Sequence, residues 1–324
     1  MTDYLTVPEA AGYLRISARK VYDLVSRSGL PHHRAGGRML FERAALAQWV
    51  RSSGREAGMP PPPMVLAGSH DALMDWAVRA SGSTLATLCR GSRDGIERVR
   101  RGDACAALLH LPCRLDDAVE VERFNVGAVR ESLGAHDVVL VNWCWRQQGL
   151  MIAPGNPWKI KSLADLRGSR ARRRPKVGRR VAGAGSRELF DLLVADLESG
   201  ATPAGAVGGR KDDAKADARA GAAAGAPFDL ALDDLESEND AAVAVRHGHV
   251  DVVFGAQSAA RTAGLGFVPL LRERVDLLVS RRSYFEPPVQ ALLDFCRSPV
   301  FADYARALDG YDLAEHGAVI WNAT

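Results

Sequence analysis

Three short segments of the chain combine glycine with a hydroxyl side chain where an apolar run gives way to a helical pattern. They are Gly68-Ser69-His70, Gly91-Ser92-Arg93 and Gly183-Ala184-Gly185-Ser186-Arg187. Glycine lets a backbone approach a ligand closely, and a serine at a helix start donates beside free backbone N–H groups. One such segment is typical of an ordinary serine cap, but three at matching positions predict a site for a small anion.

The elements that must position these segments alternate along the chain from Val65 onward. Strands are expected at residues 65–67, 84–89, 104–111, 138–145, 150–153, 181–182, 250–255, 267–271 and 275–280, and helices at 71–80, 95–101, 162–167, 186–197, 240–247, 289–296 and 301–308. This alternation predicts an α/β fold with parallel sheets covered by helices on both faces. Ligands of such sheets bind where strands end and helices begin, which is where the three segments lie.

The N-terminal part of the chain follows a different pattern. Thr6 and Glu9 form a capping-box signature for a first helix, and Ser17 is placed to begin a second. The pair Gly36-Gly37 lies between two short strand-like runs and predicts a hairpin, after which a third helix is expected. Two helices, a basic hairpin and a closing helix indicate a small module that reads DNA.

The charge distribution supports this interpretation. Residues 1–57 contain nine Lys/Arg and five Asp/Glu, so this segment carries +4, while the chain as a whole carries +3. The remainder is therefore close to neutral. A positive excess confined to a small module is what a polyanionic partner requires, although it is common on small domains.

The sequence YLTVPEAAGYLRISARKVYDLV, continued by GLPHHRAGGRMLF, resembles the excisionase/MerR-type winged helix-turn-helix family over nearly all of residues 3–51. The resemblance implies that the second helix enters the major groove and that the hairpin lies along phosphates. The residues it implies at DNA are Ser17, Arg19, Lys20 and Tyr22 on the helix, and Arg34 and Arg38 on the hairpin. A helical adaptor for another protein is the alternative, and no metal is expected at His32 and His33, which lack a facing ligand pair.

The large module resembles the type II periplasmic-binding-protein fold, and most of all its molybdate/tungstate-type branch and the regulator-fused relatives of that branch. The motifs that carry the resemblance are GSHDALMDWA, RGSRDGIERVRRGDACAALLHL, WRQQGLMIAPGNPWKIKSLADL, GAGSRELFDLL and AAVAVRHGHVDVVFGAQSAARTAGLGFVPL. They cover most of residues 65–280. The fold expected for the whole chain is therefore α/β, a two-lobed type II periplasmic-binding-protein fold preceded by a small winged helix-turn-helix domain.

This resemblance also implies which residues hold the ligand. Hydroxyls and backbone amides of the family correspond to Ser69, His70, Ser92 or Arg93, Ala184, Gly185 and Ser186, and the helix start near Ser237. Arg187 is expected either to add charge to the site or to pair with a surface carboxylate. Arg146 and Gln148 lie where the family's chain crosses between lobes, so we expect hinge and cleft-wall roles for them.

Three domains follow from these patterns. Residues 1–56 are expected to form the winged helix-turn-helix domain, 57–64 a proline-rich linker, and 65–324 the ligand-sensing domain. Lobe I is expected at about 65–145 and 272–324, and lobe II at about 149–270. Residues 201–227, of which 16 are Ala or Gly, are expected to be a disordered insertion. The basic run 167–180 is interpreted as a solvated loop, as a second phosphate-contacting patch, or as a surface that attracts a larger anionic ligand.

The leading hypothesis is a cytoplasmic, ligand-responsive transcriptional regulator that senses molybdate or tungstate and binds double-stranded DNA as a homodimer. The alternative keeps the DNA-binding architecture but places sulfate, phosphate, a carboxylate or a phosphorylated cofactor in the cleft. An enzyme is the remote alternative, because the sequence has no GxxxxGK[ST], GxSxG or HExxH motif. No catalytic residue, metal or cofactor is expected, nor is a signal peptide or an apolar run long enough for a membrane.

Overall fold

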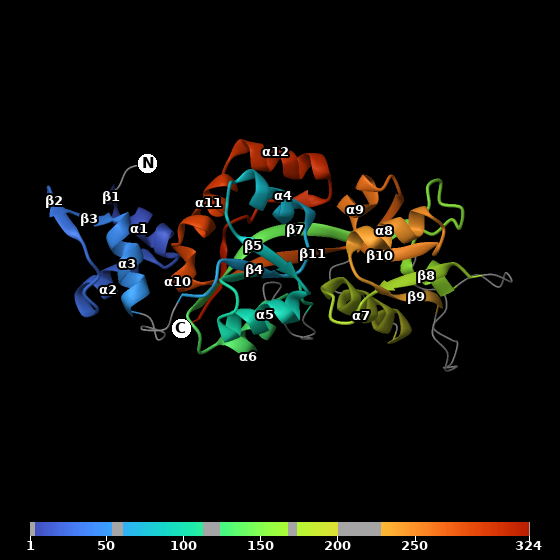
Figure 1. Ribbon diagram of the computed structural model, residues 1–324, viewed down its shortest axis with the longest axis horizontal. Coiled ribbons are helices and arrows are strands. Elements are labelled where there is room, and N and C mark those ends of the chain that lie inside the picture. Colours follow the sequence, from blue (N-terminus) through green and yellow to red (C-terminus); the bar gives the residue numbers. More distant parts are fainter. Residues whose placement is uncertain (1–3, 54–60, 113–123, 168–173, 200–227, 324) are drawn as a thin grey trace.

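The computed structural model describes residues 4–53, 61–112, 124–167, 174–199 and 228–323. The molecule is elongated, with the N-terminal domain at one end followed by two α/β lobes (Figure 1). The insertion expected at 201–227, residues 168–173 of the basic run and residues 57–60 of the linker lie outside the described part of the chain.

The N-terminal domain packs three helices against a small antiparallel sheet. The strands are β1 (Tyr4–Leu5), β2 (His33–Ala35) and β3 (Arg38–Glu42), in the order β1-β3-β2, and the helices are α1 (Val7–Leu14), α2 (Ala18–Arg27) and α3 (Arg43–Ser53). The Thr6 backbone N–H donates to Glu9 Oε2 over 2.8 Å, and Ser17 Oγ accepts from the Lys20 N–H over 3.2 Å. Both predicted helix starts and the β2–β3 hairpin are confirmed.

A single mixed sheet runs through both lobes, in the order β5-β4-β6-β11-β7-β10-β8-β9. In lobe I, β4 (Val65–Gly68), β5 (Ala86–Cys89) and β6 (Ala106–Leu109) are parallel, and in lobe II, β8 (Lys176–Arg180), β9 (Asp229–Leu235) and β10 (Val252–Ala256) are parallel. The prediction of parallel sheets is therefore right for these outer strands. It is wrong for the centre, where the strands are antiparallel.

The two central strands are long and connect the lobes. Strands β7 (Val138–Ile152) and β11 (Gly266–Ser280) pair antiparallel along nearly their whole length, with Arg146 opposite Glu273. We expected each to be two short strands separated by a polar segment, and this expectation is wrong. The polar residues remain in the sheet because they satisfy one another there: Arg146 and Glu273 are buried and hydrogen-bonded together.

Helices cover both faces of this sheet (Figure 1). Lobe I has α4 (Ala72–Ala80), α5 (Ser92–Arg101), α6 (Val126–Leu133), α10 (Arg281–Tyr284), α11 (Pro287–Phe295) and α12 (Pro299–Leu308), and lobe II has η2 (Leu163–Arg167), α7 (Gly185–Ser199), α8 (Glu238–Arg246) and α9 (Gln257–Thr262). Two short C-terminal strands, β12 (Tyr311–Asp312) and β13 (Val319–Asn322), pair with β7. The sequence did not indicate α6, α9, α10, β9, β12 or β13. The strand expected at 181–182 is wrong, because the strand of this region is β8, which ends at Arg180 before the turn to α7.

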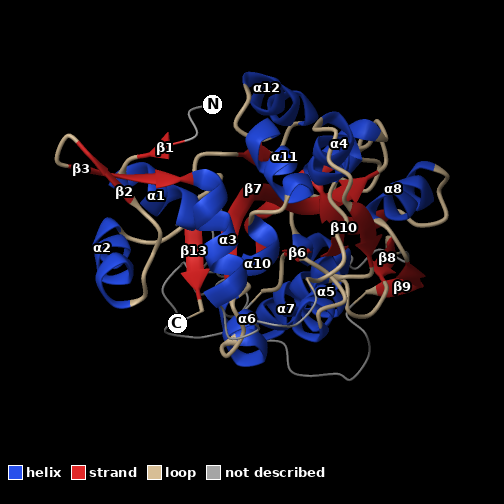
Figure 2. Cartoon of the chain, turned by 60° about the vertical axis from the view of Figure 1, so that its left-hand side comes forward, coloured by secondary structure: helices blue, strands red, loops and turns tan. Residues whose placement is uncertain are grey.

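The N-terminal domain packs directly on lobe I, next to α10 and β13 (Figure 2). Buried residues of the two parts form one continuous apolar cluster, and the rings of Tyr13 and Phe285 lie 4.7 Å apart. Pro62, in the described end of the linker, is also buried. The position of the N-terminal domain is therefore set by contacts with lobe I in addition to the linker.

Candidate ligand site between the lobes

Two of the predicted serines meet at the start of lobe I's helices. Ser69 follows β4, and Ser92 begins α5; their hydroxyl oxygens are 2.8 Å apart and both side chains are buried. Ser92 Oγ also accepts the backbone N–H of His110, the residue after β6, over 3.0 Å. Since only one of the two serine hydrogens is used between them, the pair retains one O–H for a ligand.

The third predicted segment reaches the same place from lobe II. A Cβ added to Gly185, at the start of α7, would lie 2.6 Å from the ring of His110, and one added to Gly91 would lie 2.8 Å from the carbonyl oxygen of Gly183. The glycines are therefore required by the close approach of the two lobes. The N-termini of α5 and α7 face each other across this contact.

Ser186, in the first turn of α7, also has unused hydrogen-bonding capacity. Its side chain is buried, and among the described residues its Oγ has no hydrogen-bond partner. A buried hydroxyl without a partner costs about 1–3 kcal/mol, so it is expected to be satisfied by something bound. The Oε1 atom of Gln148 on β7 is likewise buried and has no hydrogen-bond partner among the described residues.

A buried guanidinium lies behind these groups. Arg146 Nε donates to Glu273 Oε1 over 2.6 Å, and its Nη1 donates to Asp71 Oδ2 over 3.0 Å. Its Nη2 is 3.6 Å from Glu238 Oε1 at the start of α8, so Arg146 connects the hinge strands to both lobes. The Tyr311 hydroxyl donates to the same Asp71 oxygen over 2.9 Å.

The ionisation of this cluster follows from its geometry. Burial alone would raise the pKa of Glu273, but Arg146 and His110 beside it hold that pKa at about 2. Burial lowers the pKa of Arg146, and the surrounding carboxylates more than compensate and raise it well above its usual value. The guanidinium is therefore already neutralised, and a ligand would be held by hydroxyls and backbone N–H groups.

Four other predicted site residues make contacts within the protein. His70 Nε2 lies 2.8 Å from Asp75 Oδ2, an interaction that raises the pKa of His70. Ser237 caps α8 by accepting from the Asp240 N–H, and Arg187 Nε donates to Asp191 Oδ2 on the surface of α7. Arg93 pairs with Glu188 across the lobes. Ala184 lies in the turn before α7, beside Gly185 and Ser186.

The Arg93–Glu188 pair is an exposed connection between α5 and α7. Arg93 Nε and Nη2 donate to the two Glu188 carboxylate oxygens over 2.7 and 3.0 Å, and the side chains are 64% and 24% exposed.

Exposed pairs contribute about 0.2–1 kcal/mol, so Glu188→Gln should raise the open-to-closed ratio of the lobes by roughly 1.5- to 5-fold. Spin-label distances between the lobes measure this ratio. Glu97→Gln, which removes the two ion pairs with Arg100 and Arg101 within lobe I, should leave this ratio unchanged. An unaltered distance distribution in Glu188→Gln would contradict the role of the Arg93–Glu188 pair.

The sequence interpretation missed several residues of this cluster. His110, Glu273, Asp71 and Glu238 were not singled out. A signal was available for His110, because it directly follows a buried strand, as Ser69 does. The charged stretch 272–276 was a signal for Glu273, because a run of charges between apolar segments is either a loop or a buried network.

The residues expected at DNA lie on the surface of the N-terminal domain, away from lobe I. All of them are exposed: Ser17, Arg19, Lys20 and Tyr22 at the start of α2, and Arg34 and Arg38 on the β2–β3 hairpin. Tyr22 is 52% exposed, which is high for a large aromatic side chain. The helix and hairpin therefore offer a basic surface that the protein itself leaves free.

The opposite side of this domain is attached to lobe I through the turn between α1 and α2. Arg15 Nε donates to the Tyr284 hydroxyl over 2.8 Å, and its Nη1 donates to the Gly317 carbonyl over 2.5 Å. Two side chains of lobe I also hold the backbone of the turn: Arg281 donates to the carbonyl of Leu14, and Asn322 donates to the carbonyl of Arg15. These contacts fix the turn by both side chain and backbone.

The two-lobed α/β domain, with helix starts facing each other between the lobes, defines a binding domain of the periplasmic type, and it is joined here to a helix-turn-helix domain. The family model described as PBP superfamily domain matches residues 75–297, and the one described as helix-turn-helix domain matches residues 4–54. The chain belongs to the PBP superfamily domain family. This combination of domains fits a ligand-sensing, DNA-binding regulator.

Individual relatives agree with this architecture. The uncharacterized protein YvgK of Bacillus subtilis is 27% identical over 338 residues, covering 98% of each chain. A Clostridium pasteurianum protein encoded in the 5' region of a 2Fe-2S ferredoxin gene is 29% identical over 80 residues, 24% of this chain and 71% of its own. A solved structure from Clostridium perfringens, a candidate phosphate ABC transporter substrate-binding protein with bound phosphate, has a TM-score of 0.50 at 12% identity, covering 75% of this chain and 96% of that one.

Within the described ranges, the helices are all too short or too polar to cross a membrane.

Proposed function

We propose that this protein is a one-component transcriptional regulator in which a small tetrahedral oxyanion, molybdate or tungstate, binds between the lobes and changes how the N-terminal domain engages DNA. The proposal places it in the cytoplasm as a homodimer on a two-fold symmetric operator. The observation that supports it best is the contact between Ser69 and Ser92 at the helix starts of lobe I, together with the buried, unpartnered Ser186 at the facing start of α7 in lobe II.

The chemistry of these groups suits a fully deprotonated oxyanion. Molybdate and tungstate carry oxygens that only accept hydrogen bonds, and serine hydroxyls with helix N-terminal N–H groups only need to donate. Because the donors come from α5 in lobe I and α7 in lobe II, a bound anion would join the lobes. Closure is then favoured because the anion binds the closed state, where both sets of donors reach it, more tightly than the open state.

Phosphate is the second candidate, and a specific observation favours it. Phosphate keeps a proton near neutral pH, so its site needs an acceptor as well as donors. The unpartnered Gln148 Oε1 is a neutral acceptor, and Glu273 and the buried Glu238 place negative charge nearby. The Clostridium perfringens neighbour shares only the fold, so this candidate rests on the acceptors of this chain.

A path from the site to the DNA-reading domain exists in the hinge strands. Strand β11 contains Glu273, which contacts Arg146, and ends at Ser280, directly before α10. The first and last residues of α10, Arg281 and Tyr284, contact the turn between α1 and α2. A shift of β11 on lobe closure would therefore reach the DNA-reading domain within one continuous segment.

Calorimetric titration of the full chain with molybdate, tungstate, sulfate and phosphate tests the ligand assignment. Ser186→Ala should weaken the binding of the preferred anion by about 10- to 100-fold, because it removes a hydrogen bond to a charged group. Ser199→Ala, at the exposed other end of α7, is the matched control and should not change the affinity. The absence of binding by all four anions, or equal affinities in the Ser186→Ala and wild-type proteins, would overturn the site.

The DNA assignment is tested with duplexes selected from a random library by the wild-type protein. Replacing Arg19 and Lys20 by alanine should weaken binding at least about tenfold and reduce the slope of log affinity against log salt by about 2, one per lost phosphate contact. Replacing Arg79 and Arg306, which are exposed on lobe I, should leave both quantities unchanged. An unaltered salt slope in the Arg19/Lys20 variant would show that α2 does not face DNA.

A further inference from the structure

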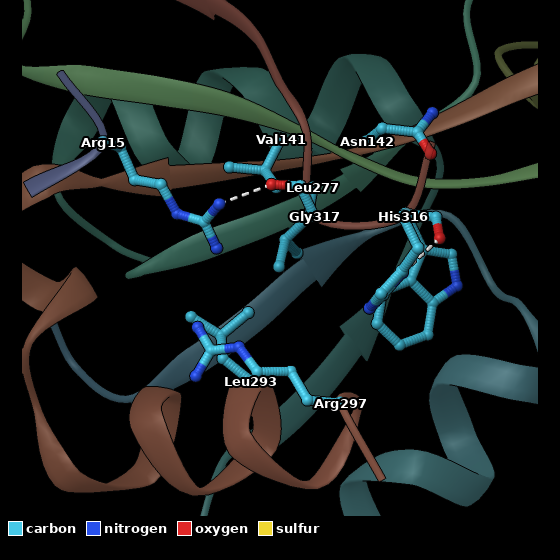
Figure 3. A pocket seen from close by; sticks show the side chains of 9 residues that line it. Arg15, Val141, Asn142, Leu277, Leu293, Arg297, His316 and Gly317 are labelled. Atoms are coloured by element: carbon cyan, nitrogen blue, oxygen red, sulfur yellow. Dashed lines mark hydrogen bonds between the residues drawn. The ribbon is translucent and has the colours of Figure 1, made fainter. Parts of the chain in front are cut away.

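A cavity lies between the N-terminal domain and lobe I, away from the interlobe site. Its volume is about 140 Å³, and Figure 3 shows side chains of both domains around it. The lining residues are Arg15, Val141, Asn142, Trp143, Leu277, Leu293, Arg297, His316 and Gly317. None of the residues proposed to bind the oxyanion lines this cavity.

The inner wall of the cavity is apolar. Val141 and Leu277 lie on the central strands, Leu293 lies on α11, and all three are buried together with Trp143. A dry cavity of about 150 Å³ lined by such side chains accommodates a benzene molecule. At about 140 Å³ the space here is close to that size, comparable with one six-membered ring.

The remaining wall is positively charged. Arg15 enters from the N-terminal domain and Arg297 from the end of α11, both toward the same space (Figure 3). Burial lowers the pKa of His316, a hydrogen bond with the Trp143 carbonyl works against this, and the positive charges of Arg15 and Arg297 lower it further. The hydrogen-bond partners of Arg15 are neutral oxygens, and no acidic side chain is among the lining residues. Arg297 Nη1 also donates to Asp294 Oδ1 over 2.6 Å, so the uncompensated charge of this wall comes mainly from Arg15.

Two guanidinium groups beside an apolar pocket of this size define the chemistry of a ligand. We propose that the cavity binds a small aromatic carboxylate, with its ring against Leu277 and Leu293 and its carboxylate between Arg15 and Arg297. Guanidinium and carboxylate groups match in charge and in planar geometry. This goes beyond the proposed oxyanion function, because it adds a second ligand class at a separate site that contacts both domains.

Calorimetric titration of the full chain with benzoate tests the proposal. Benzoate should bind with a dissociation constant of about 0.1–1 mM, and benzyl alcohol at least about tenfold more weakly, since it lacks the charge. Arg297→Ala should weaken benzoate binding by at least about fivefold, and Leu293→Phe should abolish it by filling the cavity. Arg306→Ala, an exposed arginine on α12, should have no effect.

Other outcomes overturn the proposal. They are the absence of benzoate binding up to about 10 mM, equal affinity for benzyl alcohol, or wild-type affinity in Arg297→Ala. If Leu293→Phe fails to give a cooperative thermal transition, Arg297→Ala decides the question alone. Ser186→Ala should bind benzoate like the wild type, so the two ligand sites succeed or fail independently.

Discussion

Replacing Glu273 by glutamine is expected to lower the free energy of unfolding by about 3–5 kcal/mol. Glu273 is fully buried on β11 and accepts hydrogen bonds from Arg146 and Gln148. Glutamine has nearly the same shape, so the variant removes the charge without leaving a cavity. The guanidinium of Arg146 then stays buried with one fewer of its carboxylate partners, which is the costly situation for a buried ion pair.

Urea unfolding at neutral pH measures this effect. Glu315→Gln is a suitable control, because Glu315 is exposed and accepts a single hydrogen bond from Trp145 Nε1 over 2.9 Å. The control should change stability by less than about 1 kcal/mol. A loss this small in Glu273→Gln would mean that Asp71 and Glu238 suffice to hold Arg146.

The same variant should alter the acid limb of the stability curve. The pKa of Glu273 is about 2 in the folded protein, below its usual 4.5. Its contribution to stability is therefore fully present above the unfolded pKa and is lost as the pH falls from about 4.5 toward 2. The wild-type protein should lose stability more steeply than Glu273→Gln across this window.

The sequence was informative wherever a local pattern decides the structure. The capping residues Thr6 and Ser17, and the glycine pair of the hairpin, act through neighbours within four positions, so the helix-turn-helix domain followed from them. Ser69 and Ser92 were also predictable, because they occupy the same place after a strand and its turn. The structure brings these two hydroxyls within 2.8 Å of each other.

The hinge was not predictable in the same way. The stretch from Arg146 to Gln148 is polar, and short-range reasoning assigns polar residues between apolar runs to a turn. Its partner, Glu273, is 127 residues from Arg146 in the sequence. Only the pairing of the two strands shows that the charges compensate each other and allow both strands to continue.

The attachment of the DNA-reading domain was missed for a related reason. The proline-rich linker is visible in the sequence, so a covalent connection between the two modules is evident while a packed contact is not. Nothing local marks Arg15 as an interdomain residue, since a basic residue in this module is expected to contact phosphates. Its partner Gly317 is 302 residues away, near the C-terminus.

Replacing Arg15 by alanine should uncouple the DNA-reading domain from the sensor. The variant loses the hydrogen bonds to Tyr284 and Gly317, while the basic surface of α2 stays intact. We expect the ligand-free variant to bind DNA within about threefold of the wild type. The change in DNA affinity caused by the bound oxyanion, typically 5- to 150-fold in coupled systems, should fall below about twofold. Fluorescence anisotropy of labelled duplex with and without the oxyanion measures both quantities.

A linker variant separates direct contact from transmission through the prolines. Pro61 and Pro63 are exposed, so replacing both by glycine should loosen the described end of the linker while Pro62 stays buried. If the contacts of Arg15 transmit the signal, the glycine variant keeps the ligand effect that Arg15→Ala loses. The reverse result would assign the coupling to the linker and contradict our account.

Arg15→Lys provides the most discriminating comparison. Lysine keeps the positive charge but has no second nitrogen to reach Tyr284 and Gly317 at the same time. Arg15 has a left-handed backbone, with φ of 55°, and its carbonyl accepts from Asn322, so the backbone of the turn is held independently of the side chain. A coupling that depends on the two-point contact should therefore be lost in lysine nearly as fully as in alanine. A coupling that depends only on charge near the cavity should survive.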